Sequence, residues 1–512
     1  MPEVAQSGHW DDVVVGGGSA GAVLAARLSQ DPDRRVLLVE AGVERLGEPQ
    51  ASYPLGMAVL SGYNWEYAAY MGTRPSGRQG PYGVGRLLGG SSAINGAIAL
   101  RGLPADFEAW AAAGNPEWSW KSVLPYFRAL ETDPDFPGEE HGSDGPIPVR
   151  RPRPEDLDPL ARGFLRACRE QGLPEVPDMT TGAVGAGPLP SNERDGRRVS
   201  TAEAYLEPAR GRPNLTVWTR TEVSRVLFRG HRARGVEALR EGRTVTAGAD
   251  RVTLCAGGVN TPLVLERSGL GDGRRLTALG VPVVADLPGV GEGLADHVAT
   301  VIWAVPKPEV CRKGVPWHQV MARLARPDGL PDLGIFLAGN VTEETIPEVG
   351  MVTDERIAVV LSAMLLAPKS RGAVHVSGAA PGDAPVITLG MLSERADVER
   401  LMEGTRLLWS LVRSPSMAGH LQDVLLWTER MILEEDRLRR SVSRFATPMW
   451  HPSGTAAMGP ADDASSVVDQ YFRVHQVENL RVVDSSVMPS PLLSPMNLTC
   501  IMLAERAAAW LA

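Results

Sequence analysis

Residues 12–42 read DVVVGGGSAGAVLAARLSQDPDRRVLLVEAG, and this stretch decides the fold. The apolar run at 12–15 predicts a buried strand, 22–29 predicts a helix, and 36–39 predicts a second buried strand. The turn between the first strand and the helix has GxGxxG spacing, with glycines at Gly16, Gly18 and Gly21. This arrangement is typical of a Rossmann-like βαβ unit that binds the pyrophosphate of a dinucleotide.

The three glycines have separate roles in such a turn. The first allows the tight turn, the second lets the backbone approach phosphate oxygens, and the third lets helix and strand pack closely. Free amides at the start of the helix then face the anion. Glu40 ends the second strand, where a carboxylate can accept hydrogen bonds from a ribose diol and disfavours a 2′-phosphate. The motif therefore argues against NADP, and by itself it leaves both FAD and NAD open.

Bulk composition narrows the class of protein. The chain has 512 residues, 43% of them hydrophobic, which is enough for two or three domains or one large two-lobed domain. The net charge of −9 without a basic run makes nucleic acid an unexpected partner, and no apolar run is long enough to predict a membrane span. The N-terminal residues have no signal-peptide pattern.

The cysteines are dispersed and lack any metal-ligand spacing; they are Cys168, Cys255, Cys311 and Cys500. Such a pattern predicts neither a disulfide framework nor a zinc site. We expect no metal. Reduced thiols fit a cytoplasmic location.

Further along the chain, a second glycine-dense stretch, GRLLGGSSAINGAIALRG, covers 85–102. Residues 150–190 are rich in Pro, Arg and Gly and are typical of a crossing between lobes. Short runs predict strands at 215–218, 223–228, 252–255 and 480–483. The region 300–445 lacks glycine motifs and is interpreted as a substrate lobe, and an apolar helix is expected at 498–511.

A helix is also predicted after the strand at 252–255. Thr261 is the expected N-cap, Pro262 the first helical residue and Gly269 the C-terminal stop.

With these blocks in view, the chain resembles the glucose-methanol-choline (GMC) family of FAD-dependent oxidoreductases over essentially its whole length. Four ordered blocks carry the resemblance: the turn at 15–21 with Glu40, the stretch at 85–102, residues 255–271, and the C-terminal pair HPSGTAAMG and VVDSSVMPSPLLSPMNLTCIMLAERAA. Within the family the chain is most similar to bacterial primary-alcohol oxidases such as hydroxymethylfurfural oxidase, notably in RGLPADFEAW and GPIPV.

The resemblance implies an α/β fold with an α+β substrate lobe. An FAD-binding domain with a discontinuous chain path is expected at 1–150, 200–300 and 450–512. A substrate-binding domain on an antiparallel sheet is expected at 151–199 and 301–449.

The implied activity is oxidation of an alcohol to a carbonyl, with hydride transfer to flavin N5. Such a step needs a base within reach of the hydroxyl proton that is neutral at working pH, which histidine satisfies. His451 in HPSGTAAMG falls at the family's active-site histidine, so it is the predicted general base. His297 in GVGEGLADH is interpreted as a structural histidine beside the cofactor. The remaining histidines are expected to face solvent: His9, His141, His231, His318, His375, His420 and His475.

Family members place a second histidine or an asparagine near the C-terminus, and here that position is Asn497. Its amide can donate to the developing alkoxide. The alternative is that Asn497 is the N-cap of the last helix, and both roles are compatible. The positive end of that helix is expected near the flavin pyrimidine. Pro495 departs from the asparagine that many members have two residues earlier, which leaves flavin orientation and substrate placement open.

Cofactor contacts carry over from the family residue by residue. They are Gly16, Gly18, Ser19, Ala20, Gly21, Glu40, Ala41, Gly90, Ser91, Asn95, Val223 for the adenine, Asp484 for the ribityl and phosphate region, and Asn497. Some members attach FAD through a histidine just before the position of Asn95, where this chain has Ile94. Non-covalent FAD is therefore predicted.

Partners follow from the same resemblance: a small-molecule alcohol, and O2 or another electron acceptor. The sequence identifies neither the alcohol, nor the acceptor, nor the oligomeric state. The family also includes non-redox lyases and a photodecarboxylase on the same fold, so these reactions stay open. A non-catalytic flavin-binding protein is the third alternative, but it would need neither His451 nor Asn497.

Overall fold

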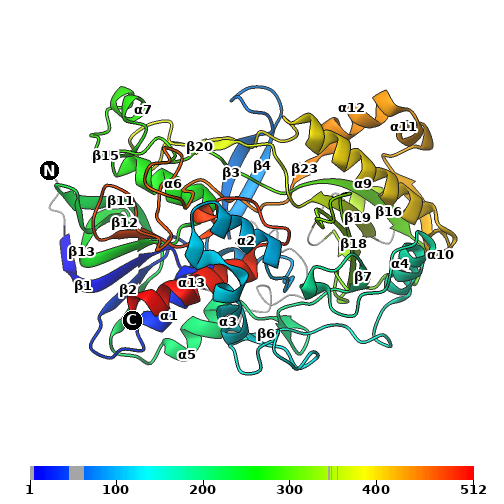
Figure 1. Cartoon of the computed structure of the whole chain (residues 1–512), viewed down its shortest axis with the longest axis horizontal. Helices are drawn as coiled ribbons and strands as arrows, with labels where there is room; N and C mark the ends of the chain where they lie inside the picture. Colours follow the sequence, from blue (N-terminus) through cyan, green and yellow to red (C-terminus); the bar gives the residue numbers. More distant parts are fainter. Residues whose placement is uncertain (1–4, 45–62, 344–345, 347–348, 354–355) are drawn as a thin grey trace.

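The computed structural model describes residues 5–44, 63–343, 346, 349–353 and 356–512. Two large sheets lie toward opposite ends of the molecule, one with the labels β1 and β13 and the other with β16 and β19 (Figure 1).

The first sheet has seven strands drawn from three separate stretches, 5–39, 215–254 and 480–482. Its order is β10 (Leu215–Trp218), β2 (Val36–Val39), β1 (Ala5–Val15), β13 (Arg243–Leu254), β12 (Arg232–Arg240) and β11 (Thr221–Arg229), with β24 (Leu480–Val482) beside β13. Strands β10, β2, β1, β13 and β24 run parallel, whereas β12 and β11 are antiparallel additions. The four residues of β2 are all buried, as expected of a central parallel strand rich in Val and Leu. The predicted discontinuous path is confirmed.

Helices close to both chain ends pack together on this sheet. Helix α1 (Gly21–Leu28) contacts β1, β2 and α13 (Asn497–Leu511). Arg27 and Glu505 form a bidentate ion pair between the helices, with both N···O distances 2.8 Å. The hydroxyl of Tyr205 also donates to Glu505 at 2.7 Å. The last helix is thereby fixed beside the nucleotide turn.

Helix α6 (Gly257–Arg267) begins five residues before the predicted first helical residue, so Thr261 is not the N-cap and Pro262 lies inside the helix. A proline there lacks the N–H that would bond to the carbonyl of Gly258. The Thr455 hydroxyl donates to that carbonyl at 2.7 Å. A tertiary contact thus replaces the missing helical bond. The stop at Gly269, with φ of +84°, is as predicted.

The second sheet is antiparallel throughout and comes from residues 185–188 and 298–448. Its order is β22 (Leu421–Leu425), β16 (Val298–Pro306), β19 (Ile357–Leu365), β18 (Leu333–Thr342), β17 (Val320–Leu324) and β7 (Gly185–Pro188), with β23 (Thr447–Pro448) beside β16. Helices packed on it are α9 (Arg395–Arg413), α4 (Pro159–Glu170) and α12 (Glu435–Phe445). The predicted antiparallel sheet of the substrate lobe is confirmed.

A four-stranded sheet lies between the two large ones (Figure 1). Its order is β20 (Ala373–His375), β21 (Val386–Thr388), β3 (Asn64–Tyr70) and β4 (Gln79–Gly85). Strand β4 leads directly into the glycine-dense stretch at 85–102.

Among the described residues, the other α-helices are α2 (Pro104–Ala112), α3 (Trp120–Leu130), α5 (Glu207–Ala209), α7 (Gly273–Ala278), α8 (Val349–Val352), α10 (Pro415–Ala418) and α11 (Glu429–Leu433). Short strands are β5 (Glu131–Thr132), β6 (Ile147–Pro148), β8 (Glu193–Arg194), β9 (Arg197–Arg198), β14 (Leu270–Gly271) and β15 (Ala285–Asp286).

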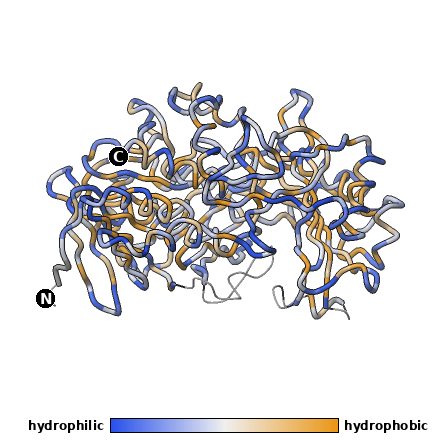
Figure 2. Tube along the Cα trace, turned by 90° about the horizontal axis from the view of Figure 1, so that it is seen from below, coloured by the Kyte–Doolittle hydropathy of each residue, from blue (hydrophilic) through white to orange (hydrophobic). Residues whose placement is uncertain are grey.

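Hydrophobic stretches of the chain concentrate in the interior of both halves of the molecule, and hydrophilic stretches lie mostly at its periphery (Figure 2). Each large sheet has its own buried apolar cluster. Within the described part of the chain, no helix combines the length and apolar character that crossing a membrane requires.

Candidate nucleotide site and active site

The GxGxxG turn has the backbone geometry that its glycines predict. Gly16 has a φ of +97°, and a Cβ there would lie 2.5 Å from the carbonyl oxygen of Cys255. A Cβ on Gly21 would lie 1.8 Å from the carbonyl oxygen of Gly16. Both positions therefore exclude any larger residue. A larger side chain at either position would clash with the backbone of the protein, because α1 packs directly against the end of β1.

Gly18 differs from its two neighbours in the motif. A Cβ on Gly18 would meet only the Cα of Gly90, at an ordinary distance of 3.7 Å. Gly90 has a φ of +51°, and its own Cβ would lie 2.7 Å from the Cα of Gly18. The two glycine-rich stretches thus face each other through bare backbone. Space is left beside Gly18 that the protein does not fill, as a phosphate-binding cradle requires.

Glu40 is held at the end of β2 by two backbone donors. The N–H groups of Gly17 and Gly42 each donate to one of its carboxylate oxygens at 2.7 Å. Burial raises the pKa of Glu40 to about 7, and the two backbone bonds oppose that rise. Each oxygen keeps a lone pair that can accept from a diol.

The polar residues of the second glycine-rich stretch bond largely within the protein. Asn95 accepts from the backbone N–H of Ala97 at 2.9 Å and from Arg198 Nη1 at 3.0 Å. Ser91 accepts from the N–H of Gly85 at 3.2 Å. The Asn95 oxygen is therefore used inside the protein, and within the described part of the chain no hydrogen bond engages its amide nitrogen.

Asp484 lies at the end of β24, where four groups donate to its carboxylate. They are the backbone N–H and hydroxyl of Ser486 at 2.8 and 2.5 Å, the N–H of Gly257 at 2.9 Å and the hydroxyl of Thr261 at 2.6 Å. Asp484 therefore fixes the start of α6. Its contact with the ribityl chain stays a prediction.

The hydrophobic members of the predicted cofactor set are Ala20, Ala41 and Val223. Ala20 is buried directly before α1, Ala41 follows Glu40, and the side chain of Val223 on β11 is buried in the core. Ala41 is partly exposed, whereas the buried side chains of Ala20 and Val223 leave their backbones as the groups predicted to meet a nucleotide.

His451 lies in a loop that Asp296 holds. The backbone N–H of His451 donates to Asp296 Oδ1 at 2.8 Å, and the hydroxyl of Tyr82 donates to Oδ2 at 2.6 Å. Trp450, directly before it, has a φ of +57°, a left-handed conformation that costs free energy for a bulky residue. Burial raises the pKa of Asp296 to about 7. This loop is held in an uncommon conformation by a buried carboxyl group.

The ring of His451 contacts a second histidine. Its Nδ1 lies 2.9 Å from Nδ1 of His297, and the other ring nitrogen of His297 lies 2.8 Å from the carbonyl oxygen of Leu492. Burial and the neighbouring His297 hold the pKa of His451 well below its ordinary value. Burial lowers the pKa of His297 to about 4. Both imidazoles are therefore neutral at pH 7, and the interpretation of His297 as merely structural missed this contact.

Three successive residues before the last helix are fixed by buried groups. The Leu492 carbonyl accepts from His297, the Leu493 N–H donates to Asp106 Oδ1 at 3.0 Å, and the Ser494 hydroxyl accepts from Arg323 Nη2 at 2.9 Å. Of these contacts, the one from His297 links the loop that precedes Asn497 to His451.

Asn497 is the first residue of α13, and the N-cap position belongs to Met496. The alternative that Asn497 is the N-cap is therefore wrong. Its Oδ1 instead accepts from the hydroxyl of Ser19 at 2.9 Å. Among the described residues no hydrogen bond engages its amide nitrogen, so that NH2 group is available to a ligand.

The expectation that the other histidines face solvent holds for His9 and His231 and is wrong for His141, which is only 8% exposed. His318, His375, His420 and His475 are partly buried. The sequence did contain a signal that His141 has partners, because Glu131 and Asp133 lie only ten and eight positions before it.

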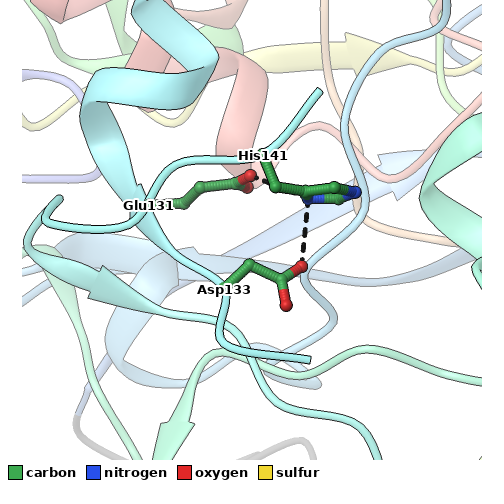
Figure 3. A group of neighbouring side chains, drawn as sticks. All are labelled: Glu131, Asp133 and His141. Atoms are coloured by element: carbon green, nitrogen blue, oxygen red, sulfur yellow. Dashed lines mark hydrogen bonds and ion pairs between the residues drawn. The ribbon is translucent and has the colours of Figure 1, made fainter. Parts of the chain in front are cut away.

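Glu131, Asp133 and His141 converge in a buried group that has the residue types of a metal site (Figure 3). His141 Nδ1 lies 3.1 Å from Glu131 and 3.0 Å from Asp133, and its Nε2 lies 3.0 Å from Asp178. Arg151 binds both oxygens of Asp133, at 2.9 and 2.8 Å, and Asp178 at 2.8 Å.

These carboxylates raise the pKa of His141 to about 10 against its desolvation. A protonated imidazole has no lone pair for a metal. With His141 protonated, the three carboxylates of Glu131, Asp133 and Asp178 face three cations: His141, Arg151 and Arg101, whose Nη1 lies 3.8 Å from Glu131. The four cysteines are buried free thiols.

Comparisons with known proteins agree with this geometry. The family models described as GMC oxidoreductase match residues 10–299 and 368–504. An oxygen-dependent choline dehydrogenase of Chromohalobacter salexigens is 33% identical over 98% of this chain and 95% of its own length. The 5-(hydroxymethyl)furfural oxidase of Methylovorus sp. is 33% identical over 98% of both chains. The crystal structure of pyridoxine 4-oxidase from Mesorbium loti superposes with a TM-score of 0.89 at 33% identity, covering 98% of this chain and 99% of that one.

Proposed function

The chain belongs to the GMC oxidoreductase family and is an FAD-dependent oxidoreductase, and from this premise we propose that it oxidises an alcohol to a carbonyl compound with His451 as the general base. The observation that carries the proposal is a continuous set of contacts. Ser19 of the nucleotide turn bonds to Asn497, and the loop before Asn497 bonds through His297 to His451.

The cradle around the nucleotide turn fits FAD. Bare backbone at Gly18 and Gly90 leaves room for the pyrophosphate, and Glu40 offers carboxylate oxygens to the ribose. We assign FAD binding to residues 1–150, 200–300 and 450–512, and substrate binding to 151–199 and 301–449. Ile94 supplies no nucleophile for a covalent link, so the FAD is non-covalent.

When bound, FAD supplies a hydride acceptor, flavin N5. The chain's own task is to take the hydroxyl proton as the hydride leaves the carbinol carbon. His451 suits this task because its low pKa keeps it unprotonated at neutral pH. The Asn497 amide NH2 donates to the substrate oxygen and stabilises the charge that develops there. Ser19 holds the opposite end of that amide.

For the substrate we propose a small primary or secondary alcohol, with O2 or another acceptor regenerating the oxidised cofactor. The names of the relatives, an oxygen-dependent dehydrogenase and two oxidases, support O2. A lyase or photodecarboxylase reaction on the same fold is the alternative, and we favour alcohol oxidation because His451 and Asn497 are both present. A cytoplasmic location stays a prediction, as does the absence of nucleic-acid and membrane partners.

The test is anaerobic mixing of the purified holoenzyme with a panel of alcohols. We expect bleaching of the flavin absorbance by at least one of them. The variant His451→Gln is expected to bleach 10²- to 10⁴-fold more slowly with FAD retained. The matched control is His231→Gln, at an exposed position. Bleaching of His451→Gln at the rate of the control would refute the base assignment, and peroxide release in air would identify O2 as the acceptor.

A further inference from the structure

We infer that His297 is a positioning residue that fixes the tautomer of His451. Its bare Nδ1 accepts a hydrogen bond from the Nδ1–H of His451, which leaves Nε2 of His451 as the unprotonated nitrogen. The tautomer follows from the contacts of the two rings together with their burial, which keeps both neutral at pH 7. Its use, to receive a substrate proton at Nε2, rests on the proposed function.

The direction of the hydrogen bonds starts at Leu492. Its backbone carbonyl can only accept, so the His297 Nε2 that lies 2.8 Å away must carry a proton. Burial lowers the pKa of His297 to about 4, against the backbone carbonyls of Leu492 and Leu366, so at pH 7 this ring has one proton. The 2.8 Å contact with Leu492 places that proton on Nε2 and leaves Nδ1 bare. The backbone carbonyl thereby sets the tautomer of His297.

The tautomer of His297 in turn determines the tautomer of His451. The Nδ1 atoms of the two rings are 2.9 Å apart, and the ring planes stand at 87°. Two bare nitrogens at this distance would repel, so Nδ1 of His451 must carry the proton and donate. His451 is also neutral, because burial and His297 depress its pKa. Its Nε2 therefore carries a lone pair.

Asp296, the residue before His297, holds the main chain of His451. Asp296 accepts the backbone N–H of His451 at 2.8 Å, while His297 fixes the ring. The adjacent pair Asp296 and His297 thus sets both the position of the loop and the proton location on the imidazole.

The chemical consequence concerns one proton. The substrate O–H bond breaks, its proton binds Nε2 of His451, and the electron pair stays on oxygen to form the carbonyl as the hydride leaves the carbon for FAD. His451 then carries protons on both nitrogens. Its Nδ1–H bond to His297 becomes charge-assisted and therefore stronger. The opposite tautomer would present an N–H to the hydroxyl and could not accept the proton.

The experiment is ¹⁵N NMR of histidine-labelled holoenzyme at pH 7.5, with the His451 signals assigned by their loss in His451→Gln. We expect a protonated Nδ1 and a bare Nε2. His318 is an internal reference, since its Nδ1 lies 3.1 Å from the Leu337 carbonyl and must donate there. A protonated Nε2 on wild-type His451 would overturn the inference, whether or not any variant folds.

Two variants of His297 separate its two contacts. In His297→Asn the amide oxygen can replace Nδ1 as the acceptor, so the His451 tautomer and the rate of flavin bleaching should stay near wild type. In His297→Gln the longer amide can still donate to Leu492 but offers no acceptor at Nδ1. We expect mixed tautomers of His451, an unchanged His318 signal and roughly tenfold slower bleaching.

The two proposals fail in different ways. If no alcohol bleaches the flavin while the NMR shows the expected tautomer, the proposed function fails and the role of His297 stands. If wild type bleaches and His297→Gln keeps both the tautomer and the rate, the role of His297 fails and the function stands.

Discussion

Ser19 donates a hydrogen bond to Asn497 Oδ1 at 2.9 Å, although 478 positions separate the two residues. Ser19 belongs to the nucleotide turn and Asn497 begins the last helix. The contact orients the amide, because accepting with the oxygen directs the NH2 group away from Ser19.

Changing Asn497 to Asp isolates that NH2 group. The carboxylate of Asn497→Asp can still accept from Ser19, but it offers no donor and adds negative charge where an alkoxide develops. We expect FAD content to be retained and the bleaching rate to fall about 10²- to 10³-fold. Ser19→Ala is the control: losing one neutral hydrogen bond should cost only about tenfold or less. An Asn497→Asp enzyme as fast as wild type would mean that the amide does not act as a donor.

The glycines of the nucleotide turn give a prediction that separates folding from binding. Gly18→Ala places its methyl 3.7 Å from Gly90 Cα, so the thermal stability of the apoprotein should stay near wild type. The same methyl occupies the proposed phosphate space, and FAD affinity should fall at least about tenfold. Gly21→Ala, with its Cβ 1.8 Å from a backbone oxygen, should instead give little folded protein. Unchanged FAD affinity in Gly18→Ala would place the pyrophosphate elsewhere.

Local patterns were sufficient for the elements that depend on local sequence. Strand β2 and strand β10 occur at the predicted residues, and the GxGxxG turn has the expected backbone. The start of α6 was misplaced because the helix tolerates Pro262 only with help from Thr455, which is far away in the sequence. No periodicity or capping signal contains such a contact.

The candidate site likewise has residues that could be predicted from motifs and contacts that could not. His451 and Asn497 were found because each stands in a recognisable motif. The contact between His297 and His451 was missed, since it depends on how two loops separated by 154 positions meet. His141 was assigned to solvent because it stands in no recognisable motif, although two of its partners, Glu131 and Asp133, lie only ten and eight positions earlier.

Glu40 leads to a prediction on pH. Because the pKa of Glu40 is raised to about 7, acidification protonates it and removes acceptor capacity. If FAD binds best to the ionised form, its affinity should weaken as pH falls through 7, as measured by FAD titration between pH 5.5 and 8.5. The Glu40→Gln variant should bind more weakly throughout and lose this pH dependence, since one backbone N–H of Gly17 or Gly42 would face an NH2 group. Affinity that rises on acidification would contradict the ribose assignment.

The base predicts a second pH effect, on catalysis. A pKa of His451 well below 6.5 means that the base is already unprotonated at neutral pH. We expect kcat/KM to be flat from about pH 6.5 to 8 and to fall only at more acid pH, measured with any alcohol that bleaches the flavin. An acid limb centred above 6.5 would show that another group carries the proton.

The ion network around His141 predicts how stability depends on pH. The folded-state pKa of His141, about 10, exceeds the unfolded value near 6.5. Its contribution should therefore be complete below pH 6.5 and be lost as pH rises toward 10. His141→Gln removes the charge that Glu131, Asp133 and Asp178 share, and at pH 6 it should cost about 3–5 kcal/mol of unfolding free energy. In that variant the decline in stability between pH 6.5 and 10 should flatten, whereas His231→Gln should leave it unchanged.

Because a protonated His141 offers no lone pair, a chelator should not alter the wild-type melting temperature. Chelator-induced destabilisation would instead identify a bound metal at Glu131, Asp133 and His141.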